Sequence, residues 1–100
     1  MSIKSDYDKF TILPDHGGEY SCEVKTGEIE IGTKHSEIVI GYKKDKVEDD
    51  LHAYLFGQPV GAEATIVIDA KSYSAVFKQI EKIAGNVEVR YGATELSPMN

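Results

Sequence analysis

The chain has no tryptophan, one cysteine and three prolines in 100 residues. A single cysteine, Cys22, excludes a disulfide within the chain, and its place in an apolar alternation predicts a buried, inert thiol. No stretch approaches the ~20 apolar residues of a membrane span, and the N-terminus lacks the apolar segment of a signal peptide. We therefore expect a cytoplasmic domain without a membrane partner, in a bacterium or in an infected host cell.

Basic residues are also scarce, because 11 Lys and Arg stand against 17 Asp and Glu, for a formal net charge of −6. Affinity for duplex nucleic acid comes largely from cations that neutralise phosphates. The composition therefore argues against direct nucleic-acid binding and favours a basic target protein as partner. The same excess of carboxylates can also serve solubility alone.

Regular alternation of apolar and polar residues from Tyr20 to Tyr42 predicts three antiparallel strands, with turns at Thr26-Gly27 and within 32–36. This register sets Ile38 beside Ile31 and Glu23 opposite Glu30. One face of the predicted meander is apolar and the other acidic: Cys22, Val24, Ile29, Ile31, Ile38 and Ile40 on the first, Glu23, Glu28, Glu30 and Glu37 on the second.

Two helices are predicted downstream. Asp45 followed by Glu48 resembles a capping box and predicts a helix over 46–56, which Gly57 ends. Apolar residues at helical spacing predict a second helix, capped by Asp69, between strands at 64–68 and 87–91. They are Tyr73, Val76, Phe77, Ile80, Ile83 and Ala84.

With a first strand at 9–13, the prediction is a small single α+β domain over residues 1–100. It consists of an antiparallel β-meander followed by a helix and a strand-helix-strand unit. The segments 1–8 and 93–100 are expected to be flexible tails.

Catalytic patterns are sparse. Pro14-Asp15 followed by Glu23-Val24-Lys25 resembles the signature of nucleases that hold a divalent metal between an Asp and a Glu, with a Lys nearby. The interval between the two elements is shorter than in those nucleases, and an acidic surface repels nucleic acid. We therefore expect Glu23 and Lys25 to be outward hairpin residues and the protein not to be an enzyme. No metal or cofactor is predicted.

The leading hypothesis is a stoichiometric protein inhibitor that binds the basic surface of a target such as a nuclease or a nucleic-acid-binding effector. A toxin-immunity protein and a phage-encoded anti-defence protein of the anti-CRISPR type are examples of this class. The candidate partner-binding residues are Glu23, Glu28, Glu30 and Glu37 on the meander and Glu48, Asp49 and Asp50 on the first helix.

Two alternatives remain open. A small-molecule module that sequesters a nucleotide would use the loop 58–63 and the N-terminus of the second helix, where Lys71 and Ser72 lie. A structural subunit would form a homodimer or larger homo-oligomer through an exposed strand edge.

Overall fold

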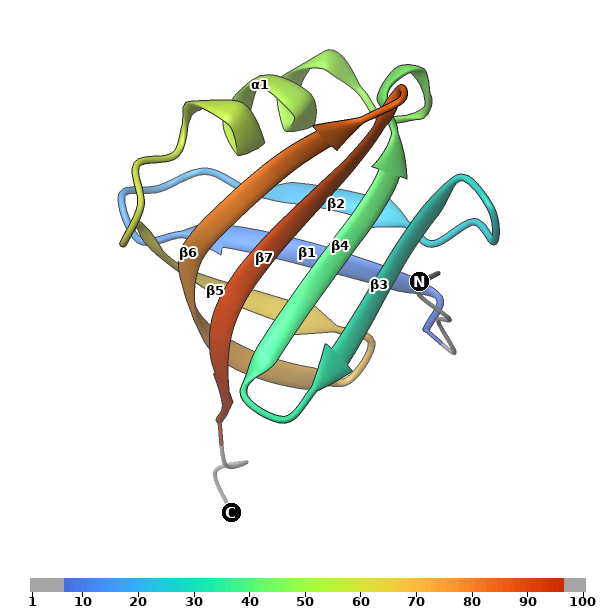
Figure 1. Ribbon diagram of the computed structural model, residues 1–100. Helices are drawn as coiled ribbons and strands as arrows, with labels where there is room; N and C mark the ends of the chain where they lie inside the picture. The colour runs from blue at the N-terminus through green and yellow to red at the C-terminus, as the bar shows by residue number, and fades with distance from the viewer. Residues whose placement is uncertain (1–6, 97–100) are drawn as a thin grey trace.

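The computed structural model describes residues 7–96, which form one antiparallel sheet with a short helix across one end (Figure 1). The elements are β1 (Lys9–Pro14), β2 (Tyr20–Glu23), β3 (Ile29–Lys34), β4 (Glu37–Lys43), the 3₁₀ helix η1 (Lys44–Lys46), α1 (Asp49–Gly57), β5 (Glu63–Ile68), β6 (Lys71–Ile83) and β7 (Asn86–Glu95).

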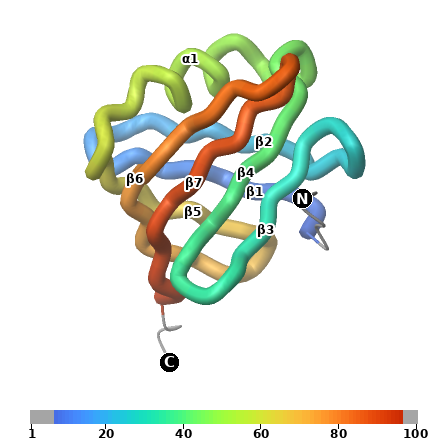
Figure 2. The backbone as a smooth tube through the Cα atoms, in the orientation of Figure 1, coloured from blue at the N-terminus to red at the C-terminus, as the bar shows by residue number. Residues whose placement is uncertain are grey.

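The seven strands follow the order β2-β1-β5-β6-β7-β4-β3, and every neighbouring pair is antiparallel. The sheet curls into a half-barrel, so that β1, β2 and β5 cross behind β6, β7, β4 and β3 (Figures 1 and 2). The predicted α+β fold is therefore wrong, since the structure is a mostly antiparallel β-sheet with one short α-helix.

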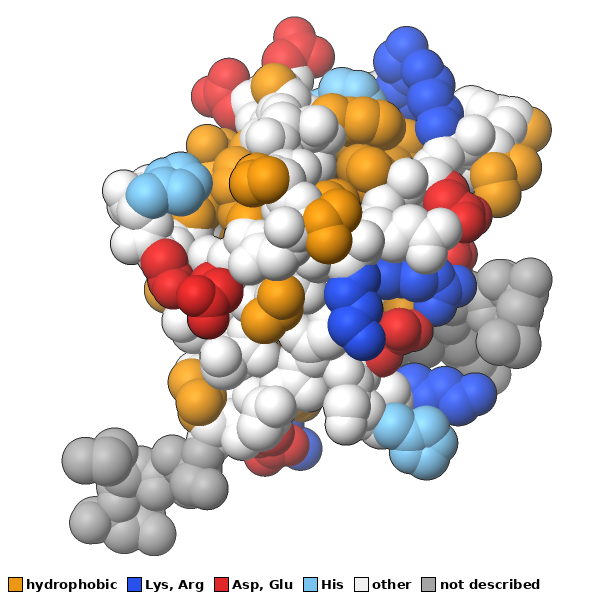
Figure 3. Space-filling view, turned by 60° about the vertical axis from the view of Figure 1, so that its left-hand side comes forward, with side chains coloured by type: hydrophobic (Ala, Val, Ile, Leu, Met, Phe, Trp, Pro, Cys, Tyr) orange, Lys and Arg blue, Asp and Glu red, His pale blue; other side chains and the backbone are white. Residues whose placement is uncertain are grey.

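The core lies on the concave side of the sheet. Inward residues alternate with outward ones along each strand, and α1 adds Leu51 and Leu55 from above. The buried side chains of the strands are Phe10, Ile12, Ile29, Ile31, Ile38, Ile40, Tyr42, Ala64, Ile66, Ile68, Tyr73, Ala75, Phe77, Val87, Val89 and Tyr91. Full burial of each large aliphatic or aromatic side chain contributes about 1.5–3 kcal/mol. The convex side carries mostly polar residues, with Val76 and Ile83 as exposed apolar exceptions. Hydrophobic side chains also lie among charged ones on the face of the molecule drawn in Figure 3.

The second predicted helix is wrong, because residues 71–83 form β6. Tyr73, Ala75 and Phe77 alternate inward as in any half-buried strand. A β-bulge between Phe77 and Gln79 then shifts the register by one residue, and Ile80 packs against the core three positions after Phe77. The strand therefore mixes spacings of two and three, which resembles the spacing of an apolar helix stripe.

The predicted three-stranded meander over residues 20–42 is also wrong. β2 pairs with β1, so Cys22 lies opposite Phe10 and Glu23 opposite Lys9. Only a single bridge, from Lys25 to Ile29, joins the 24–28 segment to the start of β3. Glu23 therefore does not face Glu30, and the predicted repulsion between them does not arise.

The β3–β4 hairpin does form, but two residues out of the predicted register. Its turn is His35-Ser36, and Ile31 lies opposite Ile40 rather than Ile38. His35 takes a left-handed φ of 55°, which a non-glycine residue rarely adopts outside tight turns. The turn lies entirely after Lys34, so Gly32 remains within the strand.

The first helix begins later than predicted. Residues 44–46 form η1, and α1 starts at Asp49 with Glu48 as a cap residue that makes no side-chain cap bond. The predicted capping box is thus absent. At the predicted tails, β7 continues through Glu95 and Asp8 bonds to Asp69; residues 1–6 and 97–100 lie outside the described residues.

Asp69 fastens the β5–β6 turn to β1 instead of capping a helix. Its carboxylate accepts the backbone N–H of Asp8 at 3.1 Å and of Lys9 at 3.2 Å, and its own N–H donates to the Lys9 carbonyl at 3.2 Å. Asp69 also has a left-handed φ of 52°, which aspartate tolerates better than alanine.

Replacing Asp69 by alanine should lower the free energy of unfolding by about 1–2 kcal/mol, because two hydrogen bonds are lost and the turn is strained. Urea denaturation measures the loss. Asp69→Gly, which relieves the backbone strain, should recover part of it. Equal stability of Asp69→Ala and the wild type would show that the hydrogen bonds of the Asp69 carboxylate do not stabilise the position of β1.

Candidate functional site

The convex side of the sheet carries a hollow of about 620 Å³ above Gly41. Four outward positions lie in one row across four strands: Glu30 of β3 is opposite Gly41 of β4, Gly41 opposite Glu88 of β7, and Glu88 opposite Glu81 of β6. We call the hollow over Glu30, Gly41, Glu81 and Glu88 the acidic groove.

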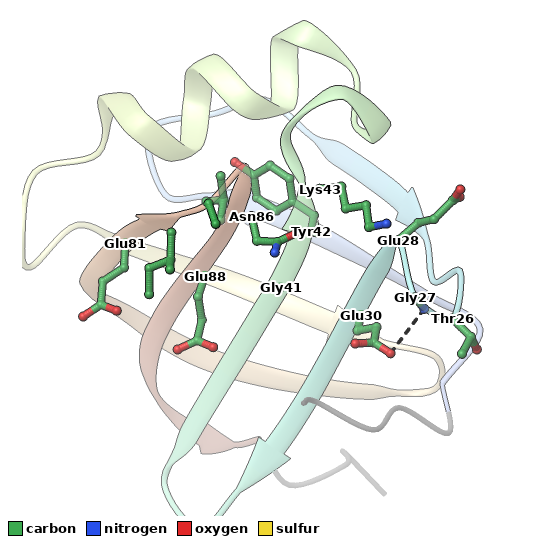
Figure 4. A pocket seen from close by; sticks show the side chains of 13 residues that line it. Thr26, Gly27, Glu28, Glu30, Gly41, Tyr42, Lys43, Glu81, Asn86 and Glu88 are labelled. Carbon is green, nitrogen blue, oxygen red and sulfur yellow. Dashed lines mark hydrogen bonds between the residues drawn. The ribbon is translucent and has the colours of Figure 1, made fainter. Parts of the chain in front are cut away.

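Gly41 gives the acidic groove its depth, because a residue without a side chain stands where every neighbour in the row carries a carboxylate. Glu81 and Glu88 lie on one side of Gly41 and Glu30 on the other, with Lys43 at the upper rim (Figure 4). Ile83, 63% exposed, adds an apolar wall at the β6–β7 hairpin. The groove therefore combines an acidic row with apolar surface.

Electrostatic repulsion is built into this row. Glu81 and Glu88 stand directly opposite one another on neighbouring strands, where like charges destabilise a sheet. Glu88 accepts a hydrogen bond from Arg90 Nη2 at 2.6 Å, and Glu81 accepts one from Gln79. A carboxylate offers about four acceptor sites. Each of the two groups can therefore accept further hydrogen bonds from a cation in the groove.

Arg90 borders the groove on the next row. Its guanidinium donates to Glu88 at 2.6 Å and to Glu37 at 2.8 Å. These bonds, the one to Glu88 first, raise the pKa of Arg90 above its ordinary value against an opposing effect of burial. Glu37 is therefore engaged by Arg90 and takes no part in lining the groove.

The seven predicted partner-binding residues fall into separate places. Glu30 and Glu28 line the acidic groove, and Glu28 also lies 3.7 Å from the ammonium of Lys46. A second hollow, of about 370 Å³ and containing both lysines and carboxylates, lies between β2 and the start of α1. Its charged lining residues are Glu19, Glu23, Lys25, Lys46, Glu48 and Asp50, while Asp49 stands in the first turn of α1.

Glu81 and Glu88 were not among the predicted site residues. The alternation over 87–91 places Glu88 on the outward side of that strand, but nothing in the sequence places the strand beside β4. Glu81 was missed because the segment around it was predicted to be a helix and not a strand. The inward alternation of Tyr73, Ala75 and Phe77 was the available signal for a strand.

The nuclease resemblance finds no counterpart in the fold. Asp15 follows β1 at one end of the β1–β2 hairpin, whereas Glu23 pairs with Lys9 at the other end. Within residues 7–96, no group of three His, Cys, Asp or Glu side chains could hold a metal ion. The carboxylates of this pattern are therefore held apart by the length of a strand.

The small-molecule alternative loses one half of its predicted site, since Lys71 and Ser72 belong to β6 and not to a helix N-terminus. The loop 58–63 does line a hollow of about 570 Å³ with Tyr54 and His16. Its amide side chain, Gln58, is already engaged, because its Oε1 accepts the Tyr91 hydroxyl at 2.9 Å.

Tyrosines fasten α1 to the sheet. Tyr20 of β2 stacks on Tyr54 with ring centroids 4.4 Å apart, and the Tyr42 hydroxyl lies 3.0 Å from His52 Nδ1.

Burial raises the pKa of Tyr42 to about 12, and burial is likewise the main cause of the raised pKa of Tyr91. Desolvation also raises the pKa of the Cys22 thiol, which makes it a poor nucleophile near neutral pH.

The protein should lose stability in alkaline solution. An unfolded tyrosine ionises near pH 10, whereas folded Tyr42 keeps its proton until about pH 12. Stability from this group is complete below pH 10 and falls as the pH rises to 12, by about 2–3 kcal/mol. Urea denaturation between pH 9 and 12 measures the decline. Tyr42→Phe should show a shallower decline, and an identical one would contradict this assignment.

No helix among residues 7–96 is long and apolar enough to cross a membrane. Comparison with known proteins gives no relative from which a role could be transferred. No family model matches the chain, and neither a curated protein nor a solved structure is similar to it at a significant level.

Proposed function

We propose that the protein is a stoichiometric inhibitor that binds a basic surface of a target protein through the acidic groove. The observation that carries the proposal is the row of Glu30, Glu88 and Glu81 around Gly41 on the exposed side of the sheet. The net charge of −6 adds a long-range attraction for a cationic partner.

An arginine or lysine of the target would enter over Gly41, between Glu30 and the Glu81–Glu88 pair. Charge-assisted hydrogen bonds to these carboxylates would relieve the repulsion between Glu81 and Glu88. The exposed side chain of Ile83 would cover the aliphatic stem of the entering residue. The free protein therefore holds a repulsion that binding removes.

Nucleases and nucleic-acid-binding effectors are suitable targets, because they present lysines and arginines to phosphates. A small acidic protein that occupies those cations excludes the nucleic acid. Toxin-immunity proteins and phage-encoded anti-defence proteins of the anti-CRISPR type act in this sense, and the proposal places the chain in this class of inhibitors.

Affinity capture from the native host, followed by titration of the captured target, tests the proposal. We expect a basic nucleic-acid-processing protein whose activity falls linearly to zero at a fixed molar ratio. Excess nucleic acid should compete with the inhibitor for the target. Capture of an acidic or neutral protein, or unchanged target activity at saturation, would contradict it.

A further inference from the structure

The sheet ends in two edge strands that differ in how they are covered. β2 has four residues, its Tyr20 stacks on Tyr54 of α1, and its chain borders the same hollow as residues 46–51. β3 has six residues, contains no proline or bulge, and is the last strand in the order of the sheet (Figure 1). Such an edge offers backbone groups for pairing.

The hydrogen-bond pattern shows which groups these are. Lys43 N–H donates to the Glu28 carbonyl at 2.9 Å, and bonding alternates along an antiparallel pair. Glu30, Gly32 and Lys34 therefore bond to β4, while the N–H and C=O groups of Ile29, Ile31 and Thr33 point to the edge. Ile29 exchanges both of its bonds with Lys25, at 2.7 and 2.8 Å. Within the described strands, the backbone groups of Ile31 and Thr33 have no pairing strand on that side. The side chain of Thr33 is hydrogen-bonded to the Tyr7 hydroxyl at 3.1 Å.

We propose that β3 pairs antiparallel with β3 of a second copy of this chain, about a two-fold axis at Gly32. Ile31 of each copy then lies opposite Thr33 of the other and exchanges two hydrogen bonds with it. All the edge groups of both residues are used. The half-barrels join into one continuous sheet, and this inference does not rest on the proposed function.

Charge complementarity selects this register. On the outer face, Glu30 of each copy lies opposite Lys34 of the other, which forms two attractive pairs. These positions are non-hydrogen-bonded pairs, in which the Cα atoms approach to about 4.5 Å and side chains are closest. Gly32 meets Gly32 on the axis without a side-chain clash.

The neighbouring registers are poorer. A shift by two residues in one direction places Ile29 opposite Thr33, but the backbone groups of Ile29 are already bonded to Lys25. A shift in the other direction places Ile31 opposite His35, which lies in the turn with a φ of 55°. Either shift also removes the Glu30–Lys34 pairing.

Sedimentation equilibrium of the full chain across a concentration series, at about 0.15 M salt to screen net repulsion, tests the dimer. We expect a concentration-dependent shift from 11.0 kDa to twice that mass. Glu30→Lys and Lys34→Glu should each weaken dimerisation about tenfold or more, because both symmetric pairs become repulsive. The double variant restores opposite charges and should recover the dimer.

Hydrogen exchange and a groove variant complete the test. The N–H groups of Ile31 and Thr33 should exchange more slowly as the concentration rises. Glu81→Gln with Glu88→Gln should leave dimerisation unchanged, which separates this inference from the proposed function. A monomer at every concentration would overturn the inference, as would a double variant that stays as weak as the single ones.

Discussion

Replacing Phe77 by alanine should lower the free energy of unfolding by about 3–5 kcal/mol. The ring is 3% exposed and packs edge-on against Tyr91, with centroids 5.9 Å apart. The backbone bonds of Phe77 to Ala62 and Gly61, at 2.8 and 2.9 Å, stay in place. The loss therefore comes from a cavity in the core. The total free energy of unfolding of a domain is about 5–15 kcal/mol. This single change therefore removes a large part of the stability of the fold.

Val76→Ala is the matched control, since Val76 is the preceding residue and is 38% exposed on the convex side. Val76→Ala should lower the free energy of unfolding by less than about 1 kcal/mol. On a helix, both residues would belong to the apolar stripe and both truncations would be costly. Denaturant unfolding of the two variants therefore distinguishes strand from helix at β6, and similar losses would contradict the strand.

Neutralising the acidic groove should weaken target binding at least a hundredfold. Glu30→Gln, Glu81→Gln and Glu88→Gln together remove the carboxylates around Gly41 while keeping the size of each side chain. Truncating one partner of a desolvated charge pair costs about 2–5 kcal/mol, and 1.4 kcal/mol corresponds to tenfold in affinity. The variant should fold at least as well as the wild type, because the repulsion between Glu81 and Glu88 is removed.

The control carries the same change in net charge elsewhere. Glu23→Gln, Asp49→Asn and Glu95→Gln remove three exposed carboxylates that do not line the groove. Surface plasmon resonance at low and moderate salt compares the two variants with the captured target. Association should slow in both, whereas dissociation should accelerate only in the groove variant. Equal losses would assign binding to net charge and not to the groove.

The faces of the strands could be predicted from the sequence, because period-two alternation reports burial directly. Ile29, Ile31, Ile38 and Ile40 are buried as predicted. The strand predicted at 87–91 is confirmed as part of β7, with Val87, Val89 and Tyr91 buried. The strands predicted at 9–13 and 64–68 are confirmed as β1 and β5. Each of these segments keeps a single spacing over its length.

Pairing could not be predicted in the same way. Alternation says which side a residue faces and nothing of which strand lies beside it. β2 could pair with β1 or with β3, and the structure pairs it with β1 through the turn that follows Pro14. In β6, the bulge at residue 78 interrupts the alternation, so that the spacing of the apolar residues resembles that of a helix.

The candidate site depends on the pairing of the strands, which could not be predicted from the sequence. Glu30 was singled out from the sequence, but its row is completed by Glu81 of β6 and Glu88 of β7, which come more than fifty residues later. Only the order β6-β7-β4-β3 brings Glu81, Glu88 and Glu30 to one level around Gly41. A local pattern does not carry that order.

The central claim is that the target contacts the acidic groove. Nuclear magnetic resonance of the isotopically labelled protein, titrated with its captured target, tests it most directly. The account predicts that the largest changes in amide resonances fall on Glu30, Gly41, Glu81 and Glu88. Changes confined to α1 or to the β1–β2 hairpin, with the groove unaffected, would contradict it.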